Sequence, residues 1–238
     1  RASDVQEEIW WGIVLGMLIV MSGYNLLVFF VLRDGKQLLL TLFGLTVAFS
    51  SALARGYASR WLSPAVALHT QAIADLAIAA VIGAFLLLAI SFLELRARLR
   101  PVYWFLTGAI GVVSLGAVAT LAGYPQVAFT VFLVVLLPAL AVVFAATILV
   151  LRQGLRMAVF FLIAQTIPIV FGILQSVSLL GLAPWLPSLG LAVPVNNLLL
   201  LLLMSLALAD LANVLGKEAS RANAALAASK QQLADYLD

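Results

Sequence analysis

The 238-residue chain alternates between long apolar stretches and short polar connections. Seven of the apolar stretches reach the length of about 20 residues that an α-helix needs to cross a bilayer. They cover approximately residues 10–32, 38–57, 65–94, 101–123, 124–151, 157–181 and 188–213. The fourth and fifth stretches run into each other, and Gly123, Tyr124 and Pro125 supply the turn that separates them. The pattern therefore predicts an all-α membrane protein with a seven-transmembrane helix bundle.

The last apolar stretch continues into a polar one without a helix breaker. No proline follows Pro194, and Gly216 is the only later glycine. A helix from Val195 to Asp238 is roughly 65 Å long at about 1.5 Å per residue, about twice the hydrocarbon thickness of a bilayer. We therefore expect a linker at 1–9, a transmembrane domain at 10–213 and a signalling helix at 214–238 that leads to an output domain outside this chain.

Composition agrees with a membrane location and excludes several kinds of site. Hydrophobic residues make up 65% of the chain and charged residues 10%, with a mean hydropathy of +1.17. The chain has no cysteine and one histidine, which excludes disulfides, cysteine-ligated metals and multi-histidine metal or haem sites. None of the lysines (Lys36, Lys217 and Lys230) lies within a predicted membrane helix, so a retinal Schiff base is excluded. We expect no catalytic residue, cofactor, metal or nucleic-acid partner; the expected partner is the lipid bilayer.

The basic residues are distributed unevenly between the two sides of the predicted bundle. All but three of the 13 Lys and Arg residues lie in alternate connections, which the positive-inside rule places in the cytoplasm. These residues are Arg33, Lys36, Arg96, Arg98, Arg100, Arg152, Arg156, Lys217, Arg221 and Lys230. The exceptions are Arg1, Arg55 and Arg60. The rule predicts an extracytoplasmic N-terminus, a cytoplasmic C-terminus and an odd number of crossings, in agreement with seven helices.

Five polar residues form a candidate outer vestibule: Arg55, Arg60, His69, Gln71 and Asp75. Asp75 lies about 28 Å along its predicted helix from Glu94 at the inner end, which places it near the outer interface. The same arithmetic places Arg55 at the outer end of the second helix. Gln71 and Asp75 share a helix face. Two interpretations stay open: interfacial residues that reach water or headgroups, or a docking site for a ligand or an ectodomain.

Other polar and small residues lie deeper in the predicted bundle. Buried amides commonly form hydrogen bonds between membrane helices, and glycines allow helices to approach closely. We expect such bonds at Asn25, Gln165, Asn196 and Asn197, and close helix contacts around Gly108, Gly111, Ser114 and Gly116, where dimerisation is the alternative.

Charges at the inner ends of the helices suggest a coupling contact. The candidate residues are Asn25, Arg33, Asp34 and Asp210. Arg33 and Asp34 are expected to cap the first helix. An ion pair to Asp210 from Arg33 or from the basic residues at 96–100 would couple the bundle to the last helix; the alternative is that these charges are only solvated.

The polar end of the last helix carries two seven-residue series. They are Ala212, Ala219, Leu226 and Leu233, and Leu215, Ala222, Ser229 and Tyr236. These positions fit a and d of a heptad, so we predict a parallel homodimer through a short coiled coil. A helix lying on the membrane surface is the alternative.

Several motifs at the two ends of the chain resemble one family. They include Gly12 to Met17, Tyr24 to Phe30 with the following Leu32-Arg33-Asp34, Phe92 to Leu95, and Ser205 to Asp210. Together they resemble the bacterial seven-transmembrane receptors with diverse intracellular signalling modules (7TMR-DISM). The sequence departs from the family pattern at Leu211, where an arginine is expected.

The resemblance implies a multi-pass sensor of the bacterial inner membrane. In that family a periplasmic carbohydrate-binding-like domain precedes the helices. A histidine kinase, nucleotide cyclase, diguanylate cyclase or phosphatase follows them, so we expect both kinds of domain outside this chain. The alternative function is a seven-helix transporter or channel for a small solute. The position of the charges at the rims of the predicted bundle favours the receptor.

Overall fold

The computed structural model describes residues 2–57, 70–166, 170 and 192–235, and within them every regular element is a helix. The helices are α1 (Ala2–Leu32), α2 (Gly35–Ala54), α5 (Thr70–Phe92), α6 (Leu95–Arg98), α7 (Arg100–Leu121), α8 (Pro125–Arg152), a shorter one at Met157–Thr166, and α10 (Ala192–Asp235). Six of those described are long and apolar enough to cross a membrane. The shorter helix begins where the sixth predicted span begins, and the remainder of that span falls largely outside the described residues. The predicted helical membrane bundle is confirmed at this level.

Local chemistry explains where α1 ends and α2 begins. Arg33 adopts a left-handed conformation with a φ of 52°, which stops α1. The Asp34 carboxylate then accepts a hydrogen bond from the Lys36 backbone N–H at 3.0 Å. This is an N-cap interaction, because it satisfies a donor that the first turn of α2 leaves without a helical partner. The prediction that Asp34 caps the first helix is therefore wrong: it caps the second.

The predicted turn between the fourth and fifth apolar stretches is confirmed. Helix α7 ends at Leu121, and Gly123 follows with a φ of +89°, a conformation that glycine adopts without steric cost. Pro125 then starts α8, where its missing N–H needs no helical partner.

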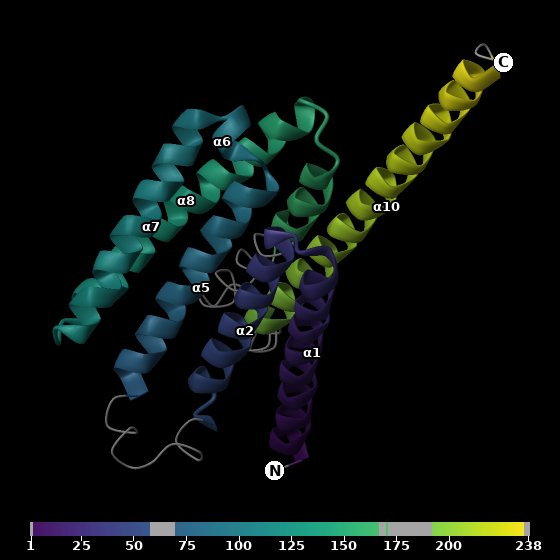
Figure 1. Cartoon of the computed structure of the whole chain (residues 1–238). Helices are drawn as coiled ribbons and strands as arrows, with labels where there is room; N and C mark the ends of the chain where they lie inside the picture. The colour runs from purple at the N-terminus through teal and green to yellow at the C-terminus, as the bar shows by residue number, and fades with distance from the viewer. Residues whose placement is uncertain (1, 58–69, 167–169, 171–191, 236–238) are drawn as a thin grey trace.

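The helices pack as a layered bundle (Figure 1). Helix α1 lies against α2, α2 against α5, α5 against α7, and α7 against α8. Helix α10 packs on both α1 and α2, which come from the opposite end of the sequence. The N- and C-termini lie at opposite ends of the molecule (Figure 1).

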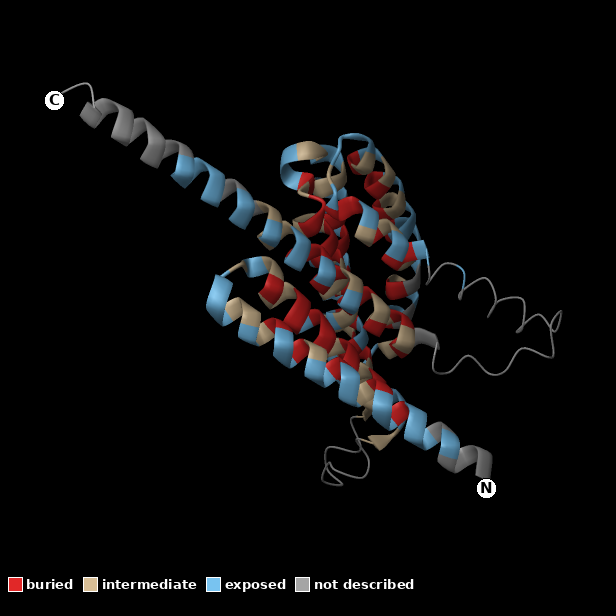
Figure 2. Ribbon diagram, turned by 90° about the vertical axis from the view of Figure 1, so that its right-hand side faces the viewer, coloured by how far each residue is buried: buried red, intermediate tan, exposed pale blue. Residues whose placement is uncertain are grey.

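Helix α10 is one continuous element of 44 residues, as predicted. Its first half is enclosed by the bundle: Leu201 and Met204 are fully buried. Its second half extends beyond the other helices in both overall views (Figures 1 and 2), and residues 220–224 are exposed. A single continuous helix therefore runs from the apolar core of the bundle to well outside it.

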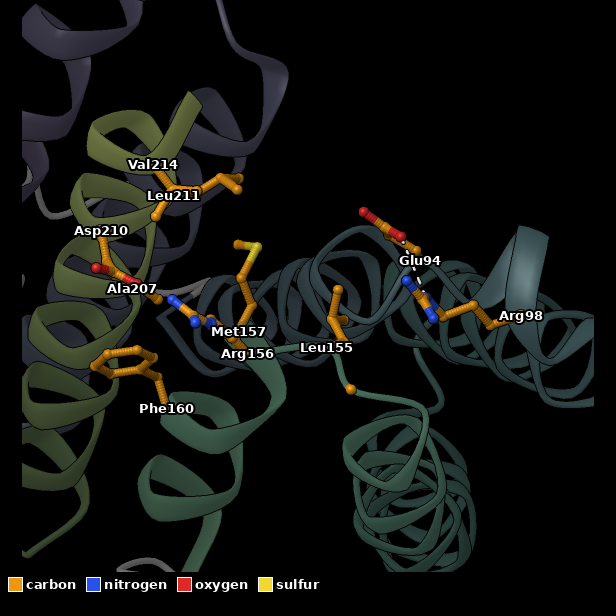
Figure 3. Close-up of a pocket in the computed structure, with 11 residues that line it drawn as sticks. Glu94, Arg98, Leu155, Arg156, Met157, Phe160, Ala207, Asp210, Leu211 and Val214 are labelled. Carbon is orange, nitrogen blue, oxygen red and sulfur yellow. Dashed lines mark hydrogen bonds and ion pairs between the residues drawn. The ribbon is translucent and has the colours of Figure 1, made fainter. Parts of the chain in front are cut away.

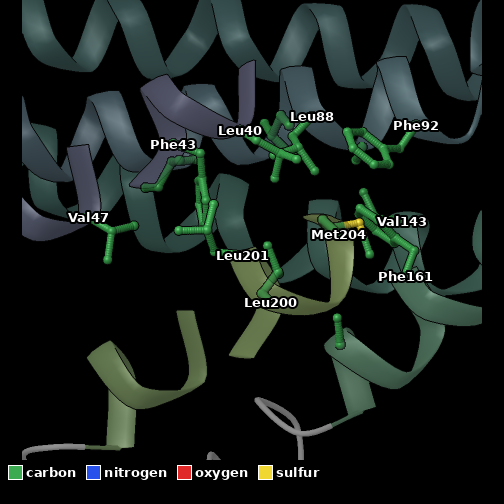
Figure 4. Packing of buried hydrophobic residues seen from close by; sticks show 14 of the residues in the cluster. Leu40, Phe43, Val47, Leu88, Phe92, Val143, Phe161, Leu200, Leu201 and Met204 are labelled. Carbon is green, nitrogen blue, oxygen red and sulfur yellow. The ribbon is translucent and has the colours of Figure 1, made fainter. Parts of the chain in front are cut away.

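The core lies between α2, α5, α8, the Met157–Thr166 helix and α10 (Figure 4). The partly buried Phe85 packs against this core: its ring centroid lies 6.4 Å from that of Phe43 and 6.2 Å from that of Phe161. The outer faces of the helices are exposed (Figure 2), and large apolar side chains such as Leu115 and Leu137 are more than 60% exposed there. Apolar side chains exposed along whole helices suit lipid rather than water. This is the packing of a multi-pass membrane protein in contact with the bilayer.

Candidate functional site

A buried polar cluster joins α10 to α1 and α2. We call it the three-helix node and define it by Ser22, Asn25, Thr41, Gly44 and Ser205. The Ser205 hydroxyl of α10 donates to the Asn25 side-chain oxygen of α1 at 3.0 Å. Asn25 is fully buried and Ser205 is 8% exposed. This bond ties the long helix directly to the first helix, and it confirms the prediction that Asn25 bonds across a helix interface.

Further hydrogen bonds orient both members of this pair. The Asn25 amide nitrogen donates to the Met21 carbonyl oxygen at 2.9 Å, which holds the amide oxygen toward α10. The Ser205 hydroxyl also lies 2.8 Å from the Leu201 carbonyl oxygen. A serine hydroxyl has one proton, so the bond to Asn25 competes with a bond within α10. The link between the two helices is therefore specific in geometry but modest in energy.

Small residues let the three helices approach closely at the node. A Cβ atom built on Gly44 would collide with the Ser22 side-chain oxygen and lie 3.0 Å from Leu201 Cδ2 of α10. The Thr41 hydroxyl donates to the Gln37 carbonyl oxygen at 3.0 Å and lies 3.4 Å from the Ser22 carbonyl oxygen of α1. Close approach at small residues is the usual way for membrane helices to gain van der Waals contact. Sequence reasoning missed Ser22, Thr41 and Gly44, because none of them stands out in the linear pattern.

A pocket of about 190 Å³ lies where α10 leaves the bundle (Figure 3). It is lined by Glu94, Arg98, Gly154, Leu155, Arg156, Met157, Phe160, Ala207, Asp210, Leu211 and Val214. Glu94 lies in the turn between α5 and α6, and Arg98 ends α6. Arg156 belongs to the connection after α8, and Asp210 to α10. The walls combine four charged side chains with a mostly apolar remainder.

The charges at this pocket are paired differently from the prediction. Arg98 Nε lies 3.2 Å from a Glu94 carboxylate oxygen, and Lys36 Nζ lies 3.9 Å from the other oxygen. Among the described residues, neither Arg33 nor any basic residue at 96–100 forms an ion pair with Asp210. The predicted ion pair is thus not formed among the described residues; Arg98 is paired instead with Glu94, one helical turn away.

Arg156 is the basic residue that faces Asp210. Figure 3 shows its guanidinium pointing toward the Asp210 carboxylate, although no ion pair joins the two side chains in the described structure. In the sequence, Arg156 stood out only as one of the basic residues that indicate topology. Its position immediately before the helix that starts at Met157 could have indicated that it lies at the same inner end of the bundle as Asp210.

The outer vestibule is described only in part. The Arg55 guanidinium lies over the Trp11 ring of α1, 4.6 Å from its centroid, a cation–π contact that the sequence analysis did not anticipate. Asp75 lies in α5 and is 4% exposed, so it is more buried than an interfacial carboxylate that reaches water. Arg60 and His69 lie outside the described residues, as does the side chain of Gln71. The grouping of the five residues stays a prediction.

Of the contacts predicted at other glycines and buried amides, some are formed in the described structure and others are not. A Cβ on Gly116 would lie 2.7 Å from the Phe132 ring of α8, which confirms a close helix contact. Gly108 and Gly111 have open space at that position. Gln165 is buried, and neither of its polar atoms has a hydrogen-bond partner in the described structure, so the predicted bond between helices is not formed there.

The heptad positions lie on α10 as far as Leu233. Their backbone is helical, Ala222 is exposed, and Tyr236 lies outside the described residues. Pairing with a second chain stays a prediction. No group of three His, Asp or Glu side chains within the described ranges is arranged to hold a metal ion.

The apolar helices and the enclosed, far-reaching α10 define the class: a multi-pass helical membrane protein. The model of one family, described as 7TM diverse intracellular signalling (7TMR-DISM), matches residues 7–211. The chain belongs to this family, as its motifs at both ends indicated. Neither curated proteins nor solved structures gave a match.

Proposed function

We propose that this chain is a transmembrane sensing module that passes an extracytoplasmic signal through α10 to a cytoplasmic output domain. In this proposal the N-terminus is outside, the C-terminus is cytoplasmic and the membrane is a bacterial inner membrane. The distribution of basic residues supports that orientation. The output domain is a kinase, a nucleotide or diguanylate cyclase, or a phosphatase, and a periplasmic sensor domain precedes the bundle.

The observation that carries the proposal is that α10 is packed inside the bundle over its first half and extends beyond it over its second. Its first half is packed against α1 and α2 and bonded to Asn25 through Ser205, and its second half continues the same helix, with residues 220–224 exposed. A rotation or shift of the enclosed half is therefore delivered to the C-terminal end without an intervening loop. Coupling of this kind needs a packed element with two arrangements that a signal can bias.

The hydrogen-bond energy at the three-helix node is small enough for a signal to change the position of α10. Hydrogen bonds between membrane helices average about 0.6 kcal/mol and reach about 1.7 kcal/mol. A contact of that size biases the position of α10 but does not lock it. The heptad positions from Ala212 to Tyr236 would carry the displacement into a parallel dimer, in which the two α10 helices turn together.

A reporter fusion tests the proposal. The chain is fused after Asp238 to a cyclase domain whose activity depends on the phase of its dimer. Replacing Ser205 by alanine should change the basal reporter activity by about threefold or more, the factor that corresponds to about 0.6 kcal/mol.

Thr147→Val is the matched control. The Thr147 hydroxyl is equally buried, but it donates only to the Val143 carbonyl oxygen of its own helix at 2.7 Å. It should leave the reporter activity unchanged. Equal activity in the Ser205→Ala variant and the parent fusion would contradict the proposal.

A further inference from the structure

Two oppositely charged and exposed residues at the pocket where α10 leaves the bundle form no ion pair in the part of the chain that the structure describes. Glu94 is engaged by Lys36 and Arg98, and Arg98 by Glu94. Arg156 and Asp210 remain, and neither forms an ion pair with a described residue. Their side chains point toward each other across the pocket (Figure 3). The pocket therefore presents one cation and one anion to whatever enters it.

The place of the pocket in the bundle narrows the class of ligand. Arg156 directly precedes an apolar helix, and Asp210 lies one turn before Val214, the last residue of the α10 span. Lipid headgroups lie at this level, just outside the hydrocarbon core. Met157 and Phe160, from the first turn of that apolar helix, give the pocket an apolar wall. The pocket is thus lined by charged side chains and by apolar ones.

We propose that this pocket binds a phosphoethanolamine group, with the phosphate on Arg156 and the primary ammonium on Asp210. A guanidinium binds phosphate oxygens through two parallel N–H donors, and an ammonium supplies three donors to a carboxylate. A pocket of about 190 Å³ is far larger than the about 10–15 Å³ that one water needs, and it has room for a headgroup of about eight non-hydrogen atoms. The source of the group is a phosphatidylethanolamine lipid or the free zwitterion.

The same charges select against the other common headgroups. The four charged side chains among the described residues of the lining sum to zero, and a purely anionic headgroup would meet the carboxylate of Asp210 without a cation to offer it. A choline headgroup carries a quaternary ammonium, which donates no hydrogen bond and is held by aromatic cages. Among the described residues that line the pocket, Phe160 is the single aromatic one.

Binding at this pocket would also act on the long helix. Asp210, Leu211 and Val214 belong to α10, so an occupied pocket would favour the arrangement in which Asp210 faces Arg156. This consequence rests on the proposed function. Binding of the ligand does not rest on the proposed function, and lipid retention measures binding alone.

The test is lipid retention by the chain in nanodiscs. Discs contain phosphatidylglycerol with either phosphatidylethanolamine or phosphatidylcholine, and native mass spectrometry counts the lipids that stay bound after release into mild detergent. We expect ethanolamine lipid to be retained at least about tenfold over choline lipid, the factor that one charge-assisted hydrogen bond supplies. Equal retention of the two lipids would overturn the proposal.

Variants assign the effect to the pocket. Arg156→Gln and Asp210→Asn should each abolish the preference, and Arg156→Lys, which keeps the cation, should retain most of it. Arg152→Gln is the matched control, because Arg152 is an exposed arginine that does not line the pocket. An unchanged preference in the Asp210→Asn variant would overturn the proposal, and far-ultraviolet circular dichroism verifies that each variant is folded.

A soluble competitor separates the two sources of the group. If millimolar phosphoethanolamine displaces the retained lipid, the site accepts the free zwitterion. If the lipid stays bound, the apolar wall at Met157 and Phe160 contributes to binding, and the ligand is the membrane lipid.

Discussion

The hydrogen bond between Asn25 and Ser205 gives the sharpest energetic prediction. It spans 180 positions of sequence and links α1 and α10 directly through polar side chains. The perturbation is a double-mutant cycle with Asn25→Ala, Ser205→Ala and the combination of both. Asn25→Ala alone also removes packing and frees the Met21 carbonyl oxygen. The cycle cancels those contributions and leaves the interaction between the two side chains.

The structure sets the expected size of that interaction. Hydrogen bonds between membrane helices average about 0.6 kcal/mol and reach about 1.7 kcal/mol, and complete burial of Asn25 favours the upper part of that range. The competing Leu201 carbonyl oxygen at 2.8 Å lowers the value, because the Ser205 proton serves one acceptor at a time. We expect a coupling free energy of about 1 kcal/mol, in the middle of the range.

The assay is reversible unfolding of the purified chain in mixed micelles, followed by circular dichroism as the fraction of denaturing detergent increases. A second cycle that combines Asn25→Ala with Thr147→Val is the control, since the Thr147 hydroxyl bonds within its own helix. That cycle should give no coupling. A value for Asn25 and Ser205 within the additivity error of about 0.3–0.5 kcal/mol would refute the claim that this bond joins the two helices.

Three further predictions concern other parts of the bundle. Gly116→Leu should destabilise the chain by about 1–3 kcal/mol, because its Cβ meets a ring of α8. Gly111→Leu, where the structure has open space, should unfold like the parent. Equal unfolding midpoints for the two variants would contradict this packing. If the outer vestibule senses a signal, Arg55→Ala and Asp75→Ala should each alter the dose response of the full-length protein at normal expression, and a parental response in both would leave these residues a structural role. A reporter fused after Asp238 should be active only in the cytoplasm, and periplasmic activity would reverse the topology.

Features that depend on local sequence were predictable. The length of each apolar stretch located the described helices, since spanning a bilayer requires about 20 apolar residues. Gly123 and Pro125 marked the turn between α7 and α8, because one adopts a positive φ and the other starts a helix. The absence of proline after Pro194 predicted that α10 is continuous.

Features that depend on which helices meet were not predictable. Asn25 stood out as a buried amide, but its partner Ser205 is 180 positions away and belongs to a helix with several small residues. The importance of Gly44 appears only once α1 and α10 lie against it. Similarly, the sequence offered several basic residues as partners for Asp210, and only the packing of the connection after α8 brings Arg156 to face it.

The central claim is that α10 transmits a change of rotation or position, and an insertion series tests it most directly. Each residue inserted into a helix rotates everything after it by about 100°, and seven residues restore the heptad register. One, two or seven residues are inserted between Gly216 and Ala219 in the fusion to the cyclase reporter, a stretch that α10 covers without a break. We predict that one or two residues disrupt the regulation of reporter activity and that seven largely restore it. Equal activity in all three variants and the parent would show that α10 is a passive tether and contradict the account.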